Sequence, residues 1–266
     1  MPNRLSTFLE LGPLHGPLAA ISSLSRDSSI EKGMLRWLGR PYVRSRYGVS
    51  MRSNWADATF NLCYFGHYGR TLSDLLGKRS QPFVFLDIGA NQGLYSLIAG
   101  KNPNCRQAIA FEPVPATFAL LEANIAANGL DNVKPVNQAI AAESGTTIIR
   151  MPPEHSGGAS MAADNGVAGL EIAIETIRQE EMDALIADGP EPILVKIDVE
   201  GFEPVVVAEL VKSRHIDRIA AVFYEMDENW ADPMALERML RDVGFTSFRK
   251  IQTAAEATHY DVLATR

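Results

Sequence analysis

The chain has 266 residues, 46% of them hydrophobic, and its 25 basic and 32 acidic side chains leave a net charge of −7. This length suffices for one large domain, or a domain with an appendage, whose core needs no disulfide or metal. The negative charge argues against a protein that binds nucleic acid through its phosphates. Cys63 and Cys105 are too few for a disulfide framework or a cysteine zinc site, which fits a reducing compartment.

The distribution of apolar residues indicates where the protein works. No stretch approaches the roughly 20 uninterrupted apolar residues of a membrane span. Polar residues, glycines and prolines between Glu10 and Pro17 stand where a signal peptide has an apolar run. We therefore expect a cytoplasmic protein without a membrane span.

The first 80 residues differ in composition from the rest. They contain short helical patterns, such as 30–38 and 71–76, broken by glycine and proline, and they are rich in aromatic residues. We expect a helical N-terminal cap on the substrate side over residues 1–80 and a main domain over residues 81–266. The aromatic residues favour packing over a ligand-binding role.

From residue 83 onward, strand patterns alternate with helical patterns. Such alternation predicts an α/β fold in which helices cover both faces of a parallel sheet. The last two extended segments predict a terminal hairpin. Strands are predicted at 83–88, 108–111, 133–140, 193–199, 219–226, 246–251 and 260–264, and helices at 94–99, 115–128, 204–212 and 234–243.

The middle of the chain is less regular. Segments 146–150 and 171–177 are predicted to be extended, and a loop rich in Gly, Ala and Ser over 156–169 lies between them. A loop of that length inside a compact domain is more often functional than idle.

The segment Phe85-Leu86-Asp87-Ile88-Gly89-Ala90-Asn91-Gln92-Gly93 is the most informative. It predicts a buried strand that ends in an acid and turns through two glycines into a helix, so that backbone N–H groups and a ligand can approach closely. It lacks the G-x-G-x-x-G pattern that cradles a dinucleotide pyrophosphate. The carboxylate of Asp87 would repel a pyrophosphate and suits a ligand with an amino group or a sulfonium.

Two further polar residues follow the next strands. Glu112 ends the second strand, where an acid can accept hydrogen bonds from both hydroxyls of a ribose, although it could instead cap the next helix. Gln138, at the third strand, is expected beside an adenine ring, with a polar turn as the alternative interpretation.

These residues together resemble the class I S-adenosylmethionine-dependent methyltransferases, and more narrowly the FkbM family. The family resemblance covers about residues 60–230. It implies a Rossmann-like fold with a mostly parallel seven-stranded sheet and a terminal antiparallel hairpin strand. The motifs that carry it are Asp87–Ser96, Phe111-Glu112-Pro113, Asn124, Asn128 and, most specifically, Lys196-Ile197-Asp198-Val199-Glu200-Gly201-Phe202-Glu203.

The resemblance implies O-methylation of a hydroxyl on a sugar or a polyketide-type natural product, with S-adenosylmethionine as cofactor. Family members often have a Tyr-Glu pair upstream of the glycine turn, whereas Tyr68 is followed here by Gly69. The acceptor is expected to be a small molecule or a glycan, and a homo-oligomer stays open. The residues expected to bind the cofactor are Asp87, Gly89, Asn91, Gly93, Glu112, Gln138 and Asp198.

Methylation of a hydroxyl needs a proton acceptor, because a sugar hydroxyl is a poor nucleophile at neutral pH. Asp198 and Glu200 follow one strand and Glu225 ends the next, at the sheet edge where catalytic groups gather. His155, directly before the loop over 156–169, is a rival base. Lys196 is predicted to face the same side as Asp198 and to need a carboxylate partner.

Several alternatives stay open. The three acids could bind a hard cation such as magnesium, but they lack an adjacent acid pair, so we expect no metal. A nucleic-acid methyltransferase would have a different motif in place of Asp198-Val199-Glu200-Gly201. A nicotinamide-dependent oxidoreductase would have the missing glycine pattern. A methyltransferase for another small molecule and a non-catalytic module that binds the cofactor are the remaining readings.

Overall fold

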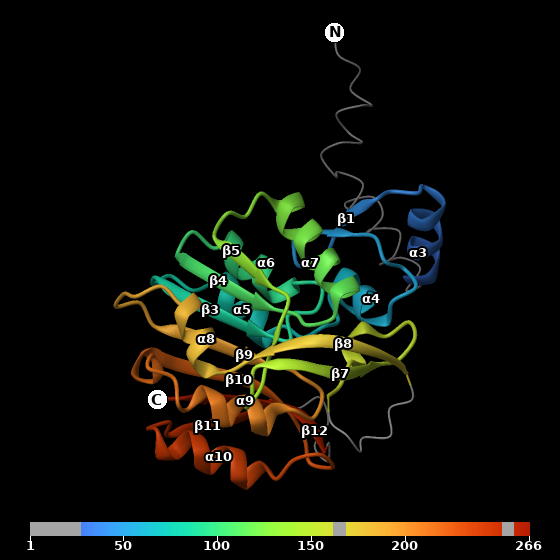
Figure 1. Ribbon diagram of the computed structural model, residues 1–266. Coiled ribbons are helices and arrows are strands. Elements are labelled where there is room, and N and C mark those ends of the chain that lie inside the picture. Colours follow the sequence, from blue (N-terminus) through green and yellow to red (C-terminus); the bar gives the residue numbers. More distant parts are fainter. Residues whose placement is uncertain (1–27, 162–168, 252–257) are drawn as a thin grey trace.

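A seven-stranded sheet forms the centre of the structure, a computed structural model that describes residues 28–161, 169–251 and 258–266 (Figure 1). Its strands are β3 (Phe83–Ile88), β4 (Cys105–Phe111), β5 (Val133–Val136), β9 (Ile193–Ile197), β10 (Ile219–Asp227), β11 (Ser247–Ile251) and β12 (His259–Thr265). They lie in the order β11-β12-β10-β9-β3-β4-β5. All neighbours are parallel except that β12 runs antiparallel to β10 and β11. The predicted sheet and its terminal hairpin are confirmed.

Helices cover both faces of this sheet, as predicted. Successive residues of β3 alternate between the faces, so Phe83 and Phe85 join one buried cluster while Val84 and Leu86 join another. The first cluster includes residues of α4 (Ala58–Phe65), α5 (Thr71–Gly77), α6 (Leu94–Lys101) and α7 (Pro115–Asn128). The second includes residues of α8 (Gln179–Leu185), α9 (Glu203–Leu210) and α10 (Pro233–Asp242).

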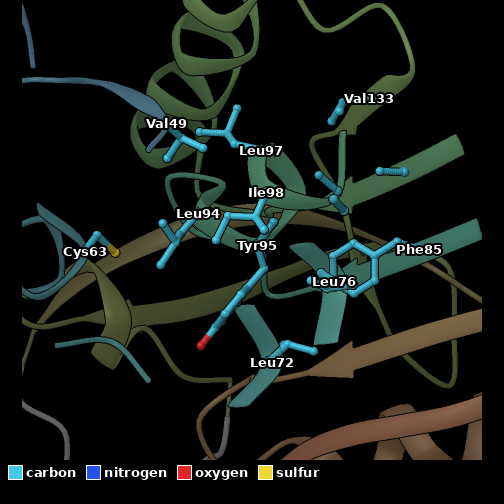
Figure 2. Close-up of a cluster of buried hydrophobic side chains, with 14 of the residues drawn as sticks. Val49, Cys63, Leu72, Leu76, Phe85, Leu94, Tyr95, Leu97, Ile98 and Val133 are labelled. Atoms are coloured by element: carbon cyan, nitrogen blue, oxygen red, sulfur yellow. The ribbon is translucent and has the colours of Figure 1, made fainter. Parts of the chain in front are cut away.

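Figure 2 shows part of the first cluster, where Leu76 of α5 and Leu97 of α6 accompany Phe85 of the sheet. All three side chains are fully buried. Burying one such side chain stabilises a fold by roughly 1.5–3 kcal/mol. The N-terminal helices and the sheet therefore share one core.

The N-terminal region also contains a small hairpin that the sequence did not predict. After α3 (Ser28–Trp37), strands β1 (Tyr42–Arg44) and β2 (Ser50–Arg52) pair antiparallel. The hairpin is bound to α7, because Ser50 N donates to Asn128 Oδ1 at 2.9 Å and Arg52 N donates to Asn124 Oδ1 at 2.6 Å. Two asparagines of the family motif thus hold the cap against the main domain, and the division at residue 80 stays a prediction.

A second, three-stranded sheet accounts for the irregular middle of the chain. It contains β6 (Ala139–Ile140), β8 (Leu170–Ile177) and β7 (Gly145–Met151), in that order. The strand predicted over 133–140 is therefore wrong as one element, since β5 and β6 belong to different sheets. The extended segment is interrupted at Asn137, whose side chain donates hydrogen bonds to the carbonyls of Glu112 and Pro113 at 2.8 and 2.9 Å. Two short 3-10 helices complete the elements, at Ser156–Gly158 and Ile216–Arg218.

Parts of two predicted features lie outside the described residues. They are residues 1–27 of the N-terminal cap and residues 162–168 of the loop predicted over 156–169. Across the described ranges, no helix combines the length and the apolar character that crossing a membrane requires.

Candidate active site

A cavity of about 580 Å³ lies at the carboxyl ends of β3, β4 and β9. This is the sheet edge where open α/β folds bind their ligands. The structure does not place Asp87, Gly93, Glu225 or His155 on its wall. The predicted site residues that line it are Gly89, Asn91, Glu112, Gln138, Asp198 and Glu200.

The glycines of the turn after β3 are required by their surroundings. Gly89 has a φ of +77°, and a Cβ there would lie 1.9 Å from the carbonyl oxygen of Asp198. Gly93 has a φ of +89°, and a Cβ there would lie 2.5 Å from Leu121 Cδ1. Gly89 therefore lets β3 and the end of β9 approach each other at the cavity, whereas Gly93 lets α6 begin against α7.

Asp87 does not contact the cavity, in contrast to the role expected from the sequence. Its side chain is fully buried, and its Oδ2 accepts hydrogen bonds from Ser96 N at 3.0 Å and Ser96 Oγ at 2.6 Å. Lys196 Nζ lies 3.5 Å from its other oxygen. Strand alternation directs Asp87 to the face covered by α6, so it binds the first turn of that helix and balances a buried cation.

Glu112 sits on the cavity wall with its carboxylate held in place. It is 5% exposed, Oε2 accepts from Asn91 N at 2.9 Å, and Oε1 accepts from Val114 N at 2.9 Å. Burial raises the pKa of Glu112 to about 7, although these two hydrogen bonds oppose the shift. Each carboxylate oxygen can accept a second hydrogen bond, so Glu112 can accept one from each of the two hydroxyls of a ribose.

The wall around Glu112 fits a nucleoside. Gln138 lines the same cavity and offers a side-chain amide, while Phe111, Ile140 and Ile149 supply apolar surface. An adenosine needs an acid for the two hydroxyls of its ribose, and an amide and an apolar slot for its adenine ring. The residues present therefore fit the adenosine part of S-adenosylmethionine.

Acidic residues gather at the carboxyl edge of the sheet beside this cavity. In the strand register, Tyr224 pairs with Ile197 and Glu225 pairs with Asp261. Asp198, which follows Ile197, therefore lies next to Glu225. One carboxylate oxygen from each of Asp198, Glu200 and Glu225 lies within 4.8 Å of the others.

Burial and mutual repulsion alter the acidity of this group. They raise the pKa of Glu200 to about 9, with burial as the larger cause and Glu225 and Asp198 as the next. Burial and Asp198 likewise raise the pKa of Glu225 and bring that of Asp261 to about 7. Glu200 therefore retains its proton at neutral pH, and the cluster does not carry its full formal charge.

Two cations compensate the acids, one on each side. Lys196 is buried, as predicted, and its Nζ lies 3.3 Å from Asp198 and donates to the Gly89 carbonyl at 2.6 Å. Burial lowers the pKa of Lys196, but Asp198 and Asp87 outweigh it and raise the pKa. His259 Nε2 lies 2.6 Å from Glu225 Oε1, and this hydrogen bond raises the pKa of His259 to about 9.

Sequence reasoning missed His259, Asp261 and the contact made by Tyr68, whose hydroxyl donates to Asp198 Oδ2 at 3.3 Å. Alternation along the last strand puts His259 and Asp261 on one face, but only the register of β12 against β10 brings that face to Glu225. Tyr68 lies 130 positions from Asp198, so no local pattern joins them.

His155 is exposed and lies off the cavity wall. Its neighbours Ser156 and Gly157 do line the cavity, because Asp57 and Thr59 hold them: Ser156 N donates to Asp57 Oδ2 at 2.8 Å and Gly157 N donates to Thr59 Oγ1 at 3.0 Å. The described part of the 156–169 loop thus contributes backbone and a serine to the site, and the choice of His155 as base rests on the sequence alone.

The chain is similar to several known methyltransferases. "Methyltransferase sdnD" of Sordaria araneosa is 26% identical over 200 residues, which cover 65% of this chain and 76% of that protein. "Methyltransferase 1" of Beauveria bassiana (strain ARSEF 2860) is 23% identical over 177 residues, covering 60% and 71%. Among solved structures, the METTL16 methyltransferase domain aligns with a TM-score of 0.49 and 15% identity, over 83% of this chain and 74% of that one.

The match to a family model is decisive. The model of the methyltransferase FkbM domain matches residues 87–247, which include the glycine turn, Glu112, the acids after β9 and Glu225 of β10. This match spans more than half of the chain and confirms the resemblance found in the sequence motifs. The chain belongs to the FkbM family and is an S-adenosylmethionine-dependent methyltransferase.

Proposed function

We propose that this enzyme methylates a hydroxyl group of a sugar or a polyketide-type natural product. The observation that carries the proposal is that Asp198 and Glu200, which form a cluster with Glu225, line the same cavity as Glu112. An acceptor hydroxyl loses a proton when its oxygen is methylated, so a group that takes up this proton must lie close by. A carboxylate cluster at the sheet edge supplies such a group.

The cofactor would bind with its ribose on Glu112 and its adenine near Gln138. When bound, S-adenosylmethionine supplies an activated methyl group on a sulfonium, for in-line transfer to the acceptor oxygen. The protein's part is to align the acceptor, exclude water and accept a proton. Fixed carboxylates near the sulfonium also attract its positive charge.

Within the cluster, the environments of the acids suggest separate roles. We assign the proton acceptor to Asp198, because Lys196 lies 3.3 Å away and attracts its negative charge, and Tyr68 orients it. Glu200, with its pKa raised to about 9 by burial and acidic neighbours, holds its proton at neutral pH and can donate a hydrogen bond to the acceptor. Glu225 is hydrogen-bonded to His259 and is the alternative proton acceptor.

We further propose that no metal takes part. One oxygen each from Asp198, Glu200 and Glu225 would suit a hard cation. Lys196 and His259, however, already place positive charge on both sides of these acids. A small-molecule or glycan acceptor fits better than nucleic acid, because the chain carries a net charge of −7.

The test is methyl transfer from S-adenosylmethionine labelled with ¹³C in its methyl group. Sugars and polyketide lactones with free hydroxyls are offered as acceptors, each beside its deoxy analogue. We expect label on oxygen in the hydroxylated acceptors and none in the deoxy controls. Label on nitrogen or carbon would contradict O-methylation, and cofactor binding without any methylated product would favour a non-catalytic module.

A further inference from the structure

A second, smaller cavity of about 240 Å³ adjoins the first. Tyr68 and Asn91 line both cavities, so the two cavities are neighbours. Cys63, Leu94 and Tyr95, drawn in Figure 2, belong to its wall, which Gln92 and Lys196 complete on the polar side. The polar groups on this wall indicate which kind of ligand group the cavity can bind.

Gln92 lines this cavity, and its side-chain amide has an unsatisfied acceptor. The side chain is 2% exposed, and its Nε2 donates to Asp57 Oδ1 at 2.9 Å and to Ser156 Oγ at 3.4 Å. Because a carboxylate can only accept, the contact with Asp57 fixes which end of the amide is the NH₂ group. Its Oε1 is buried and has no hydrogen-bond partner among the residues that the structure describes.

The orientation of Gln92 is rigid. Asp57 is itself 5% exposed, and it accepts from Phe60 N at 2.7 Å and from Ser156 N at 2.8 Å. Rotation of the Gln92 amide would therefore break its bond to a buried carboxylate. A buried acceptor without a donor costs roughly 1–3 kcal/mol, so an acceptor held in this state points to a ligand that supplies the donor.

Charge determines which donor fits. Lys196 lines the cavity, but its one positive charge faces two carboxylates, Asp87 at 3.5 Å and Asp198 at 3.3 Å. Asp57 adds a further negative group on the far side of Gln92. The surroundings therefore carry an excess of negative charge, which favours a cationic donor over a neutral one.

We propose that the small cavity binds the α-ammonium group of the methionine part of S-adenosylmethionine, and that Gln92 Oε1 accepts its hydrogen bond. With the ribose on Glu112 in the first cavity, the methionine part extends past Tyr68 and Asn91 into the second. Gln92 takes the role that the sequence suggested for Asp87. This proposal rests on the use of S-adenosylmethionine and not on which acceptor is methylated.

Calorimetric titration with two ligands tests the proposal. One ligand is S-adenosylhomocysteine, and the other is its deaminated analogue, which keeps the adenosine, the sulfur and the carboxylate. Gln92→Met removes the acceptor at nearly equal side-chain length. Because a hydrogen bond to a charged group is lost, we expect S-adenosylhomocysteine to bind roughly 10- to 100-fold more weakly, and the analogue to bind as it does to the wild type.

The same substitution at Gln107 is the matched control. Its side chain bonds to Leu185 O and Ala187 N, and it lines neither cavity. Gln107→Met should therefore change neither affinity. An equal loss for both ligands in Gln92→Met would reveal a purely structural role, and unchanged binding of S-adenosylhomocysteine would show that Gln92 makes no contact with the ammonium. Either result overturns the proposal.

A measurement on the wild type covers the case in which Gln92→Met does not fold. The ¹³Cδ resonance of Gln92 should shift when S-adenosylhomocysteine is added and should stay in place with the deaminated analogue. Identical shifts with both ligands, or equal affinities of the wild type for both, would contradict the proposal. No acceptor is present in these assays, so their failure leaves O-methylation untouched, and failure of O-methylation leaves the ammonium site intact.

Discussion

The imidazole Nε2 of His259 lies 2.6 Å from Oε1 of Glu225, and this contact joins the first residue of β12 to an acid near the end of β10. Asp227 and Glu200 add further negative charge around the imidazole. This pair connects the acidic cluster to solvent, since about half of the His259 side chain is exposed. The protonation state of His259 therefore reports on the charge of the acidic cluster.

We predict that Glu225→Gln lowers the pKa of His259 from about 9 toward its ordinary value near 6.5. Because the folded-state pKa of His259 is raised, its protonation stabilises the fold at about pH 6.5, and this stabilisation is lost as the pH rises through about 9. At lower pH the pair is also lost, once Glu225 takes up a proton. NMR titration of the imidazole measures the shift. Glu228→Gln is the control, because Glu228 bonds to Tyr260 instead. An unchanged titration in Glu225→Gln would show that the pair does not form.

The buried carboxylate of Glu112 predicts a pH dependence of cofactor binding. Burial raises its pKa to about 7, and only the ionised form accepts hydrogen bonds from two ribose hydroxyls with both oxygens. The affinity for S-adenosylhomocysteine should therefore fall by up to roughly tenfold per pH unit below pH 7. Glu112→Gln should bind weakly at every pH and lose this dependence. Calorimetry at several pH values checks both, and a dependence retained in the variant would assign it to another group.

Replacement of Gly89 by alanine should disrupt the junction between β3 and β9. The new Cβ would lie 1.9 Å from the Asp198 carbonyl at a φ of +77°. We expect a loss of about 4 kcal/mol or more in the free energy of unfolding, measured with urea. Gly129→Ala is the matched control, since its φ is +63° but no atom lies within 4 Å of the Cβ position. It should lose only about 1–2 kcal/mol. Equal losses would mean that the close approach is unimportant.

Asp198→Asn tests the proton acceptor. A positioned base contributes roughly 100- to 10,000-fold to a rate, so turnover should fall by at least about 100-fold while the affinity for the cofactor changes much less. Asp217→Asn makes the same chemical change at an exposed acid and should have wild-type turnover. Wild-type turnover in Asp198→Asn would move the base to Glu225, the alternative acceptor, or to His155, the rival expected from the sequence.

Metal removal should leave the enzyme active. Lys196 and His259 already balance the acids that could bind a cation. We expect methyl transfer to survive exhaustive chelation and titration with Mg²⁺ to show no tight binding. Activity that is lost on chelation and restored by Mg²⁺ would establish a metal at Asp198, Glu200 and Glu225.

Much of the fold could be predicted from local patterns. The run Phe85–Gly93 contains both the buried strand and the glycines that the turn requires, and Glu112 follows its strand directly. The β1–β2 hairpin was missed because each strand has only three residues and depends on asparagines of α7 about 75 positions away. Local patterns reveal which residues end a strand, but they do not reveal these distant partners.

The functional residues show the same limit. The sequence suggested Asp87 as a ligand contact because it precedes the glycine turn. In the structure its carboxylate instead accepts a hydrogen bond from Ser96 and pairs with Lys196. No local pattern indicates a role for His259, because its partner Glu225 lies 34 positions earlier in the chain. In both cases the role depends on the register of strands and the start of a helix, and these are set by packing across the whole sheet.

The central claim is that the cavity at the carboxyl ends of β3, β4 and β9 binds S-adenosylmethionine through Glu112. Calorimetric titration with S-adenosylmethionine and, separately, with NADH tests it most directly, on the wild type and on Glu112→Ala. We predict binding of one S-adenosylmethionine per chain, no binding of NADH, and loss of binding in a Glu112→Ala variant whose circular dichroism spectrum is unchanged. Preferential binding of NADH, or wild-type affinity in Glu112→Ala, would contradict the claim.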